Sequence, residues 1–317
     1  MLNLRDLVLA NALFGGNTGG SSGGGGSAEE WIGDGKTHLW IKIATEGRMD
    51  VPLVFNQTVT DGVIVDWGDG SAPETFSKTG RVQTTHTYAN IGEYCITLDA
   101  VDGCTLTLTF VMGITGKPEV YKNMLQKAEI GDSVKIGDSA FNGCYSLASV
   151  TIPDSVTSIG SGAFSSCYSL ASVTIPDSVT SIGGNAFYSC YSLASVTIPD
   201  GVTSIGEKGF YYCYSLASVT IPDSVTSIGD SAFVNCYSLA SVTIPDSVTS
   251  IGSGAFSSCR GLGKVRFDGT TPPTVANSNA FFSLPTDCII SVPVGCLDAY
   301  KTATNYPAPA TYTYIEE

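Results

Sequence analysis

The sequence predicts a mainly β protein, in which a solenoid of 23-residue repeats follows a small β-sandwich. Ahead of the repeats, short alternating apolar segments are separated by turn residues, which is typical of a sandwich. The repeat itself is marked by six cysteines at a spacing of 23 residues: Cys144, Cys167, Cys190, Cys213, Cys236 and Cys259. A fixed period of this length indicates units that bury their apolar faces only by stacking on neighbours.

One copy of the repeat, IGSGAFSSCYSLASVTIPDSVTS at 159–181, predicts the structure of one coil. Its strand is the LASVTI segment, whose apolar residues should point inward and whose remaining residues should face solvent: Leu170, Val173 and Ile175 against Ala171, Ser172 and Thr174. Pro176 cannot donate a backbone hydrogen bond to a ladder, so the strand should end there. Asp177 and Ser178 suit the turn that follows.

The rest of the coil supplies the other side of the core. Val179 and Ile182 should return inward, and Gly183 permits a tight bend. The opposite wall should come from Ala163, Phe164 and Cys167. Successive coils should therefore stack identical side chains in ladders.

The recurring motif IPDSVTSIG…AF…C…L resembles the BspA-like leucine-rich repeat family of bacterial surface proteins, over roughly residues 125–300. The resemblance implies a curved solenoid used for adhesion or recognition, without catalysis. We place the solenoid and its C-terminal cap at 136–300, with a final strand at 290–293. Residues 117–135 should form a polar N-terminal cap that carries Lys117, Lys122 and Lys127, and 301–317 should form an extended tail.

Residues 28–116 predict the β-sandwich. Its strands are expected at 38–43, 51–55, 63–67, 94–100 and 104–111. The stretch VDWGDGS, followed by HTY and GEY, resembles the polycystic-kidney-disease (PKD) domain, although DWGDG replaces the usual WDFGDG. That resemblance implies an immunoglobulin-like spacer.

The last two strands of the sandwich are predicted to form a hairpin. A three-residue loop at 101–103 would pair Leu98 with Leu106 and would place Gly103 at the left-handed position that such loops favour. This register keeps the apolar residues of both strands on one face.

The first 27 residues predict a tether. Residues 1–14 should form an apolar helix, and 15–27 form a Gly/Ser linker. The helix would dock on a larger assembly or pair with another copy; a signal peptide is the competing interpretation, which Asp6 beside Arg5 disfavours. A short helix before polyglycine also resembles the opening of phage and prophage tail proteins.

Charge and composition exclude several classes of partner. The chain has 29 acidic and 15 basic residues, for a net charge of −14. Nucleic acid and anionic membranes both require basic surfaces, and no apolar run is long enough to span a membrane. We expect an extracellular protein on a bacterial cell surface or a virion.

The sequence contains no recognisable catalytic motif, so we expect neither an enzyme nor a bound cofactor. His38 and His86 are the only histidines, and the repeat cysteines lack the CxxC spacing of a metal site. We expect those cysteines to be buried and reduced. Asp66 and Asp69 leave calcium binding open as an alternative.

Three rows of side chains are candidates for function. An aromatic row that follows the cysteines should face solvent and bind a protein or glycan, or else only stabilise the stack: Tyr145, Tyr168, Tyr191, Tyr214 and Tyr237. A polar sheet face could hold an extended ligand: Ser172, Thr174, Ser195 and Thr197. An acidic row would cap turns or bind cations: Asp154, Asp177, Asp200, Asp223 and Asp246. The alternative function is a structural component, for example of a phage tail, whose repeats mainly give length.

Overall fold

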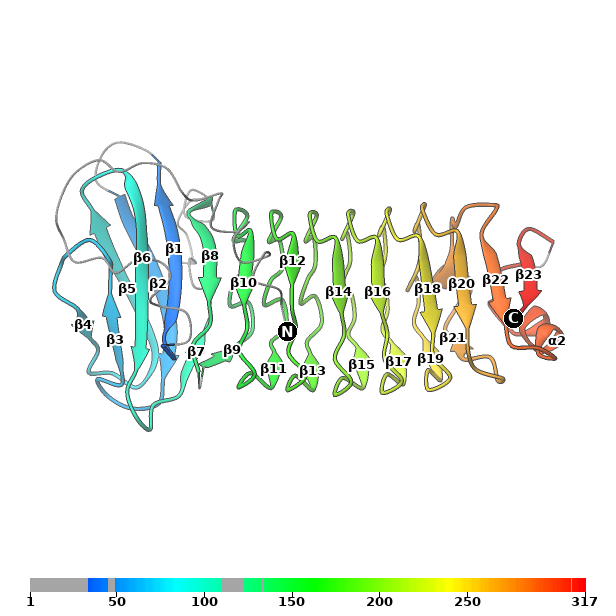
Figure 1. Cartoon of the computed structure of the whole chain (residues 1–317), viewed down its shortest axis with the longest axis horizontal. Helices are drawn as coiled ribbons and strands as arrows, with labels where there is room; N and C mark the ends of the chain where they lie inside the picture. The colour runs from blue at the N-terminus through cyan, green and yellow to red at the C-terminus, as the bar shows by residue number, and fades with distance from the viewer. Residues whose placement is uncertain (1–33, 45–48, 110–122, 133, 309) are drawn as a thin grey trace. The chain divides into compact units, whose positions relative to one another are not determined.

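The computed structural model describes residues 34–44, 49–109, 123–132, 134–308 and 310–317. The N-terminal helix and linker expected over 1–27 lie outside these residues. Gly33–Glu317 form one compact unit, whose regular secondary structure is mostly β-strand (Figure 1). In the part of the chain that is described, no helix has the length and apolar character needed to cross a bilayer.

The N-terminal part of this unit is a sandwich of two sheets. One sheet has the order β1-β6-β3-β4, formed by β1 (Thr37–Ile43), β3 (Val63–Asp66), β4 (Glu74–Thr75) and β6 (Gly92–Ala100). The other has the order β7-β2-β5, formed by β2 (Met49–Gln57), β5 (Gly80–Tyr88) and β7 (Leu106–Leu108). All five predicted strands are present. The sequence did not reveal β5 because it is mostly polar and buries only Val82 and Tyr88.

The predicted hairpin between the last two strands of the sandwich is wrong. Both edges of β6 are occupied, by β1 and by β3, and β7 instead pairs with β2 in the other sheet. The 101–103 turn therefore crosses between the sheets. Gly103 does adopt the expected left-handed conformation, with φ of 80°. Leu98 and Leu106 both face the core, as the pattern requires, but from opposite sheets.

The sandwich continues directly into the solenoid, because both of its sheets do. β8 (Leu125–Glu129) pairs with β1 on one side and with the first solenoid strand on the other. β9 (Val134–Ile136) likewise joins β7 to the second row of solenoid strands. Strands of the sandwich thus cover the first coil, in place of the polar cap that we expected over 117–135. Lys127 lies over the Trp40 ring at 4.4 Å, whereas Lys117 and Lys122 lie outside the described residues.

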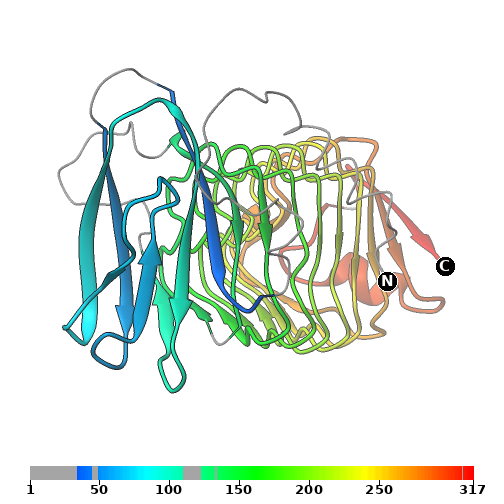
Figure 2. The ribbon, with the colours of Figure 1, turned by 60° about the vertical axis from the view of Figure 1, so that its left-hand side comes forward.

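Each coil of the solenoid contributes one strand to each of two rows, and the coils follow one another from β8 onward (Figure 2). The first row consists of β10 (Ser149–Thr151), β12 (Ser172–Val173), β14 (Ser195–Thr197), β16 (Ser218–Thr220), β18 (Ser241–Ile244) and β20 (Lys264–Phe267). The second row consists of β11 (Ser158–Ile159), β13 (Ser181–Ile182), β15 (Ser204–Ile205), β17 (Ser227–Ile228), β19 (Ser250–Ile251) and β21 (Thr274–Val275). Within β10 to β19, each strand that pairs with the next does so in parallel and in the register of the repeat.

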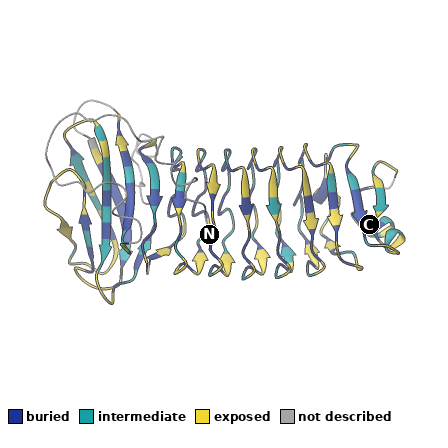
Figure 3. Ribbon diagram, in the orientation of Figure 1, coloured by how far each residue is buried: buried dark blue, intermediate teal, exposed yellow. Residues whose placement is uncertain are grey.

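The core of the solenoid is a set of ladders of identical side chains. Six phenylalanine rings stack at centroid separations of 5.3–5.4 Å: Phe141, Phe164, Phe187, Phe210, Phe233 and Phe256. The predicted inward and outward residues of the strand are confirmed, and Figure 3 shows the resulting alternation of buried and exposed positions. Only Ile182 is less buried than expected.

The repeat cysteines are buried, as predicted, and each from Cys167 onward has a defined partner. Its Sγ donates to the phenylalanine carbonyl of the preceding coil at 3.1–3.3 Å, as Cys190 does to Phe164. Burial raises the pKa of these thiols well above the ordinary value of 9.0, for example at Cys190 and Cys236. The cysteines therefore act as small core residues that also link neighbouring coils.

The C-terminal end of the solenoid is closed by residues that we expected to form a free tail. β22 (Ile289–Val292) pairs with β20, and β23 (Thr313–Glu316) then adds a further parallel strand beyond β22. Between them lies α2 (Leu297–Thr302). Tyr300 is buried and donates to the carbonyl of Gly269 at 2.7 Å. The tail is extended at β23, but it is part of the sheet.

Candidate functional site

The predicted tyrosine row is a continuous stack. Ring centroids of successive tyrosines lie 4.5, 4.6, 4.9 and 5.0 Å apart, with interplanar angles of 2–12°, along Tyr145, Tyr168, Tyr191, Tyr214 and Tyr237. These separations are those at which offset aromatic rings attract. The main chain holds the spacing, because the amide N of Ser192 donates to the carbonyl of Tyr168 and later coils repeat this bond.

The row has a defined end and stays uncharged. The next coil has Arg260 in place of tyrosine, and its guanidinium lies 5.3 Å from the centroid of the Tyr237 ring. Burial, and then the neighbouring Tyr191 and Tyr237, raise the pKa of the Tyr214 hydroxyl above its usual range. Tyr237 is 37% exposed, while the four rings before it are half-buried. A ligand would therefore meet a neutral strip of ring edges and hydroxyls.

The Ser/Thr face adjoins the tyrosine row on the same coils. Ser172, Thr174, Ser195 and Thr197 are all exposed, on or beside β12 and β14. The hydrogen-bond ladder runs without a break from the tyrosines through Ala171 and Ala194 into these strands. The structure thus places the nine residues of these two predicted sets on neighbouring segments of the solenoid.

The acidic row gains no ligand-binding role. Asp154, Asp177 and their equivalents are exposed, and the turns beside them are closed by other groups. Val179 donates its amide to the carbonyl of Pro176, and the Ser178 hydroxyl donates to the carbonyl of Val156 in the preceding coil. Among the residues that the structure describes, no group of three or more His, Cys, Asp or Glu side chains could hold a metal ion.

The two aspartates considered for calcium are engaged in the DWGDG loop. Asp66 accepts from the amide of Gly68 at 2.9 Å, and Asp69 accepts from His86 Nε2 at 2.7 Å. Burial alone would raise the pKa of Asp69, but hydrogen bonds from His86 and Ser71 hold it below its usual range. The His86 ring also stacks on Trp67 at 4.7 Å. These contacts hold the His86 ring against the loop.

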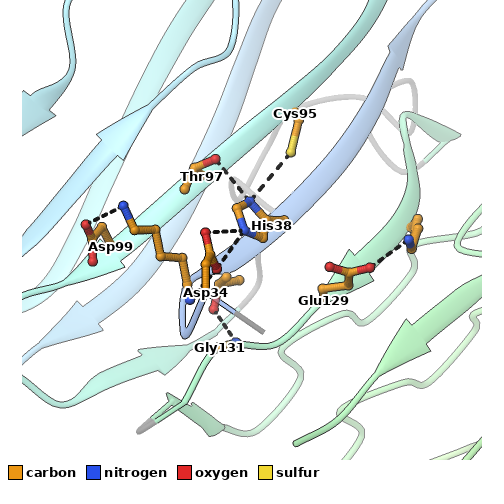
Figure 4. Close-up of polar contacts among 10 residues, drawn as sticks. Asp34, His38, Cys95, Thr97, Asp99, Glu129 and Gly131 are labelled. Atoms are coloured by element: carbon orange, nitrogen blue, oxygen red, sulfur yellow. Dashed lines mark hydrogen bonds and ion pairs between the residues drawn. The ribbon is translucent and has the colours of Figure 1, made fainter. Parts of the chain in front are cut away.

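A group of residues resembling a catalytic triad lies where the sandwich meets the first coil. Figure 4 shows His38 on β1, between Asp34 and the β6 residues Cys95 and Thr97. His38 Nε2 lies 3.1 Å from Asp34 Oδ1, but Nδ1 is closer to the Thr97 hydroxyl, at 3.1 Å, than to Cys95 Sγ, at 3.8 Å.

The protonation state of the thiol argues against nucleophilic chemistry in this group. Burial raises the pKa of Cys95 to about 12, so the thiol stays protonated at neutral pH, whereas catalysis needs the thiolate. The adjoining Thr37 hydroxyl accepts from the amide of Gly131 at 3.0 Å, which ties β1 to the first coil. The cluster therefore fastens the junction.

A second tyrosine cluster, which the sequence did not predict, lies beside the row. Tyr188 stacks on Tyr211 at 5.2 Å, Tyr211 contacts Tyr212 at 4.2 Å, and Tyr212 reaches Tyr214 of the row at 5.6 Å. A signal was present in the repeat: two copies read FYSC and FYYC, where the other four read FNGC, FSSC, FVNC and FSSC. A consensus of the repeat hides residues that differ in one or two copies. A surface feature confined to two coils can come only from such residues.

The fold is that of a parallel solenoid whose strands carry the leucine-rich pattern. Residues 134–263 match the family model described as BspA type Leucine rich repeat region, in six copies. The repeat region of this chain therefore belongs to that family.

Several solved structures are similar to the chain. A leucine-rich repeat protein of T. pallidum is 34% identical, over 51% of this chain and 77% of that one, with a TM-score of 0.44. A leucine rich cell surface protein of Faecalibacterium prausnitzii is 29% identical, over 60% and 66%, with a TM-score of 0.42. A leucine-rich repeat protein of Bacteroides ovatus is 25% identical, over 55% and 58%, with a TM-score of 0.36. No curated protein matches the chain.

Proposed function

We propose that this chain is a non-enzymatic recognition protein, exposed on a bacterial cell surface or a virion, that binds a protein or glycan through its solenoid. The observation that carries the proposal is the tyrosine row, a neutral aromatic strip on a protein of net charge −14. Tyrosine is enriched at the energetic centres of interfaces, and its ring also stacks on sugars.

The row is not needed to build a coil, which favours a role in binding. The coil that carries Arg260 in place of tyrosine still buries Cys259, Leu262 and Val265 fully. Internal stacking is already supplied by the phenylalanine ladder. The exposed Ser/Thr face beside the row would add hydrogen-bonding hydroxyls to the same contact.

The remaining parts of the chain suit display of this surface. In the proposal, the PKD-like sandwich acts as a spacer, and the N-terminal helix and linker tether the protein to a larger assembly. A specific observation favours the alternative of a structural component, for example of a phage tail. The two sheets pass unbroken from sandwich to first coils, so added repeats would lengthen one stiff body.

A double substitution separates recognition from structure. We would replace Tyr191 and Tyr214 by serine and, as the control on the adjoining face, Ser172 and Ser195 by alanine. Glycan and cell-surface-protein arrays would then be compared with thermal melting. Recognition through the row predicts lost binding in the tyrosine variant with little change in melting temperature. The Ser/Thr variant, which removes only the bordering hydroxyls, should lose much less affinity.

Three other outcomes would support a different role or a different site. A lower melting temperature, with binding that merely follows the loss of fold, would support the structural role. Binding lost only in the control variant would move the site to the Ser/Thr face. An array without any specific partner for the wild-type chain would contradict recognition.

A further inference from the structure

A groove of about 380 Å³ lies along three successive coils, beside the second tyrosine cluster. Its lining includes Ser139, Asn142, Ser161, Ser165, Asn185 and Tyr188. These side chains are hydroxyls, amides and one phenol, and none of the described residues that line the groove is charged. Its volume lies within the range of small-ligand sites, roughly 300–1,000 Å³.

The sequence of one repeat position explains why the groove exists. In successive coils this position is Asn142, Ser165, Tyr188 and Tyr211. Small side chains in the first two coils leave the surface hollow, and the large ring of Tyr188 then stands as a wall. Tyr211 lies parallel to Tyr188, at 5.2 Å and 7°, and covers one face of its ring. The opposite face of the Tyr188 ring lines the groove.

A strained residue supports this wall. Tyr212 has φ of 63°, in the left-handed region, where the equivalent residues of other coils are Gly143, Ser166, Ser189, Asn235 and Ser258. A bulky side chain in this conformation is a genuine outlier, and such strain is concentrated at functional sites. The Tyr212 ring packs against Tyr211 at 4.2 Å and against Tyr188 at 6.1 Å. Its position thus holds the stacked pair from the side.

We propose that this groove binds the end of a neutral oligosaccharide. A sugar ring would lie on the free face of Tyr188, where its C–H groups contact the aromatic surface. Its hydroxyls would exchange hydrogen bonds with the side chains of Asn142, Ser161 and Asn185. Because the groove is walled at one end, it suits the terminus of a chain and not a polymer that passes through.

Charge selects the neutral class of sugar. The Asp138 carboxylate accepts from the amide of Ser161 in the groove at 2.7 Å, which disfavours an anionic group there. Lys208, in a following coil, is paired with Glu207 at 2.6 Å. The net charge of −14 further disfavours sulfated or sialylated chains. Tyr212 lies between this groove and the tyrosine row, with its ring 6.1 Å from Tyr188 and 5.6 Å from Tyr214, so variants on each side are needed to tell the two sites apart.

The test uses the full chain and an array of short neutral oligosaccharides of glucose, mannose, galactose and N-acetylglucosamine, with sulfated and sialylated chains beside them. Affinity for each bound sugar would be measured by calorimetry. Tyr188→Ser should weaken binding of a neutral sugar by about tenfold or more. The control Tyr94→Ser makes the same chemical change on β6 of the sandwich, outside both proposed surfaces, and should leave that affinity unchanged. Tyr237→Ser is made beside it to report on the tyrosine row.

A second variant guards against misfolding. Asn142→Leu keeps the rings and removes an amide from the groove floor, and it should also weaken the sugar while its melting temperature stays at the wild-type value. The proposal is overturned if no neutral oligosaccharide binds, if only anionic chains bind, or if both groove variants bind as the wild type does. Loss of binding in Tyr237→Ser alone would assign the sugar to the row.

Discussion

The sandwich and the solenoid share the same two sheets but specify them in different ways. In the sandwich, each strand meets a partner of different sequence, as where Leu39 of β1 lies opposite Ile96 of β6. In the solenoid, each residue meets a copy of itself, as where Val196 lies opposite Val219. The sandwich is therefore held by long-range complementarity, whereas the solenoid is a sum of similar coils, each coupled only to its neighbours.

The largest effect expected from this difference is in how far the loss of stability caused by one core substitution extends along the chain. Phe187→Ala removes a fully buried ring from the phenylalanine ladder and should cost about 3–5 kcal/mol. Hydrogen exchange should rise in the coils beside residue 187 and not in the sandwich. Phe55→Ala, the matched change in the sandwich, should raise exchange across all its strands. An even increase over both regions after Phe187→Ala would contradict the contrast.

The second prediction concerns alkaline pH. Burial raises the pKa of Cys167, Cys190 and Cys236 well above 9.0, so these thiols stay protonated when folded and ionise when unfolded. The unfolded chain then binds fewer protons, and stability should fall as pH rises above about 9. Local unfolding of the solenoid should rise more steeply than that of the sandwich.

Hydrogen exchange corrected for its intrinsic pH dependence would measure this effect. Replacing Cys190 and Cys236 by alanine should flatten the pH dependence of the solenoid, even though the variant is less stable at neutral pH. An unchanged slope in that variant would show that the thiols are not the cause.

The smallest effect expected is a gain in stability. Tyr212→Asn gives this coil the asparagine that Asn235 provides one coil later. It should remove the strain of a left-handed tyrosine, which is about 1–2 kcal/mol. Some ring contact is lost, so we expect the melting temperature to rise by less than the strain alone implies. Ser258→Asn, a change between two residues found at this left-handed position and at a partly exposed site, is the control. A lower melting temperature in Tyr212→Asn would mean that ring packing outweighs the strain.

The repeats explain why the solenoid could be predicted residue by residue. Leu170, Val173 and Ile175 were assigned correctly because the same pattern recurs in every coil, and its period leaves one inward face. The sandwich offers no such repetition. The alternation in 94–100 and 104–111 identified the buried face, but it could not identify the partner strand, and so Leu98 and Leu106 were paired wrongly.

The candidate site shows a similar division. The tyrosine row was predicted from its period, and its stacking follows from the spacing of the coils. The groove depends on Tyr188, Tyr211 and Tyr212, which differ from the residues at the same positions of other repeats. Their proximity to Ser139 and Asn142 of an earlier coil is seen only in the three-dimensional structure. The closing strand β23 was missed because its Pro-, Thr- and Tyr-rich surroundings carry no apolar period.

The pairing of β8 with β1 and of β9 with β7 has a consequence for how the chain folds. Near-identical coils could stack on one another with a coil skipped, because a shift by one whole repeat loses few specific contacts. The first coil, in contrast, meets strands of unique sequence in the sandwich, at Leu39 opposite Ala128 and Leu108 opposite Ile136. A preformed sandwich would thus act as the template that sets the starting point, from which coils add in order toward the C-terminus.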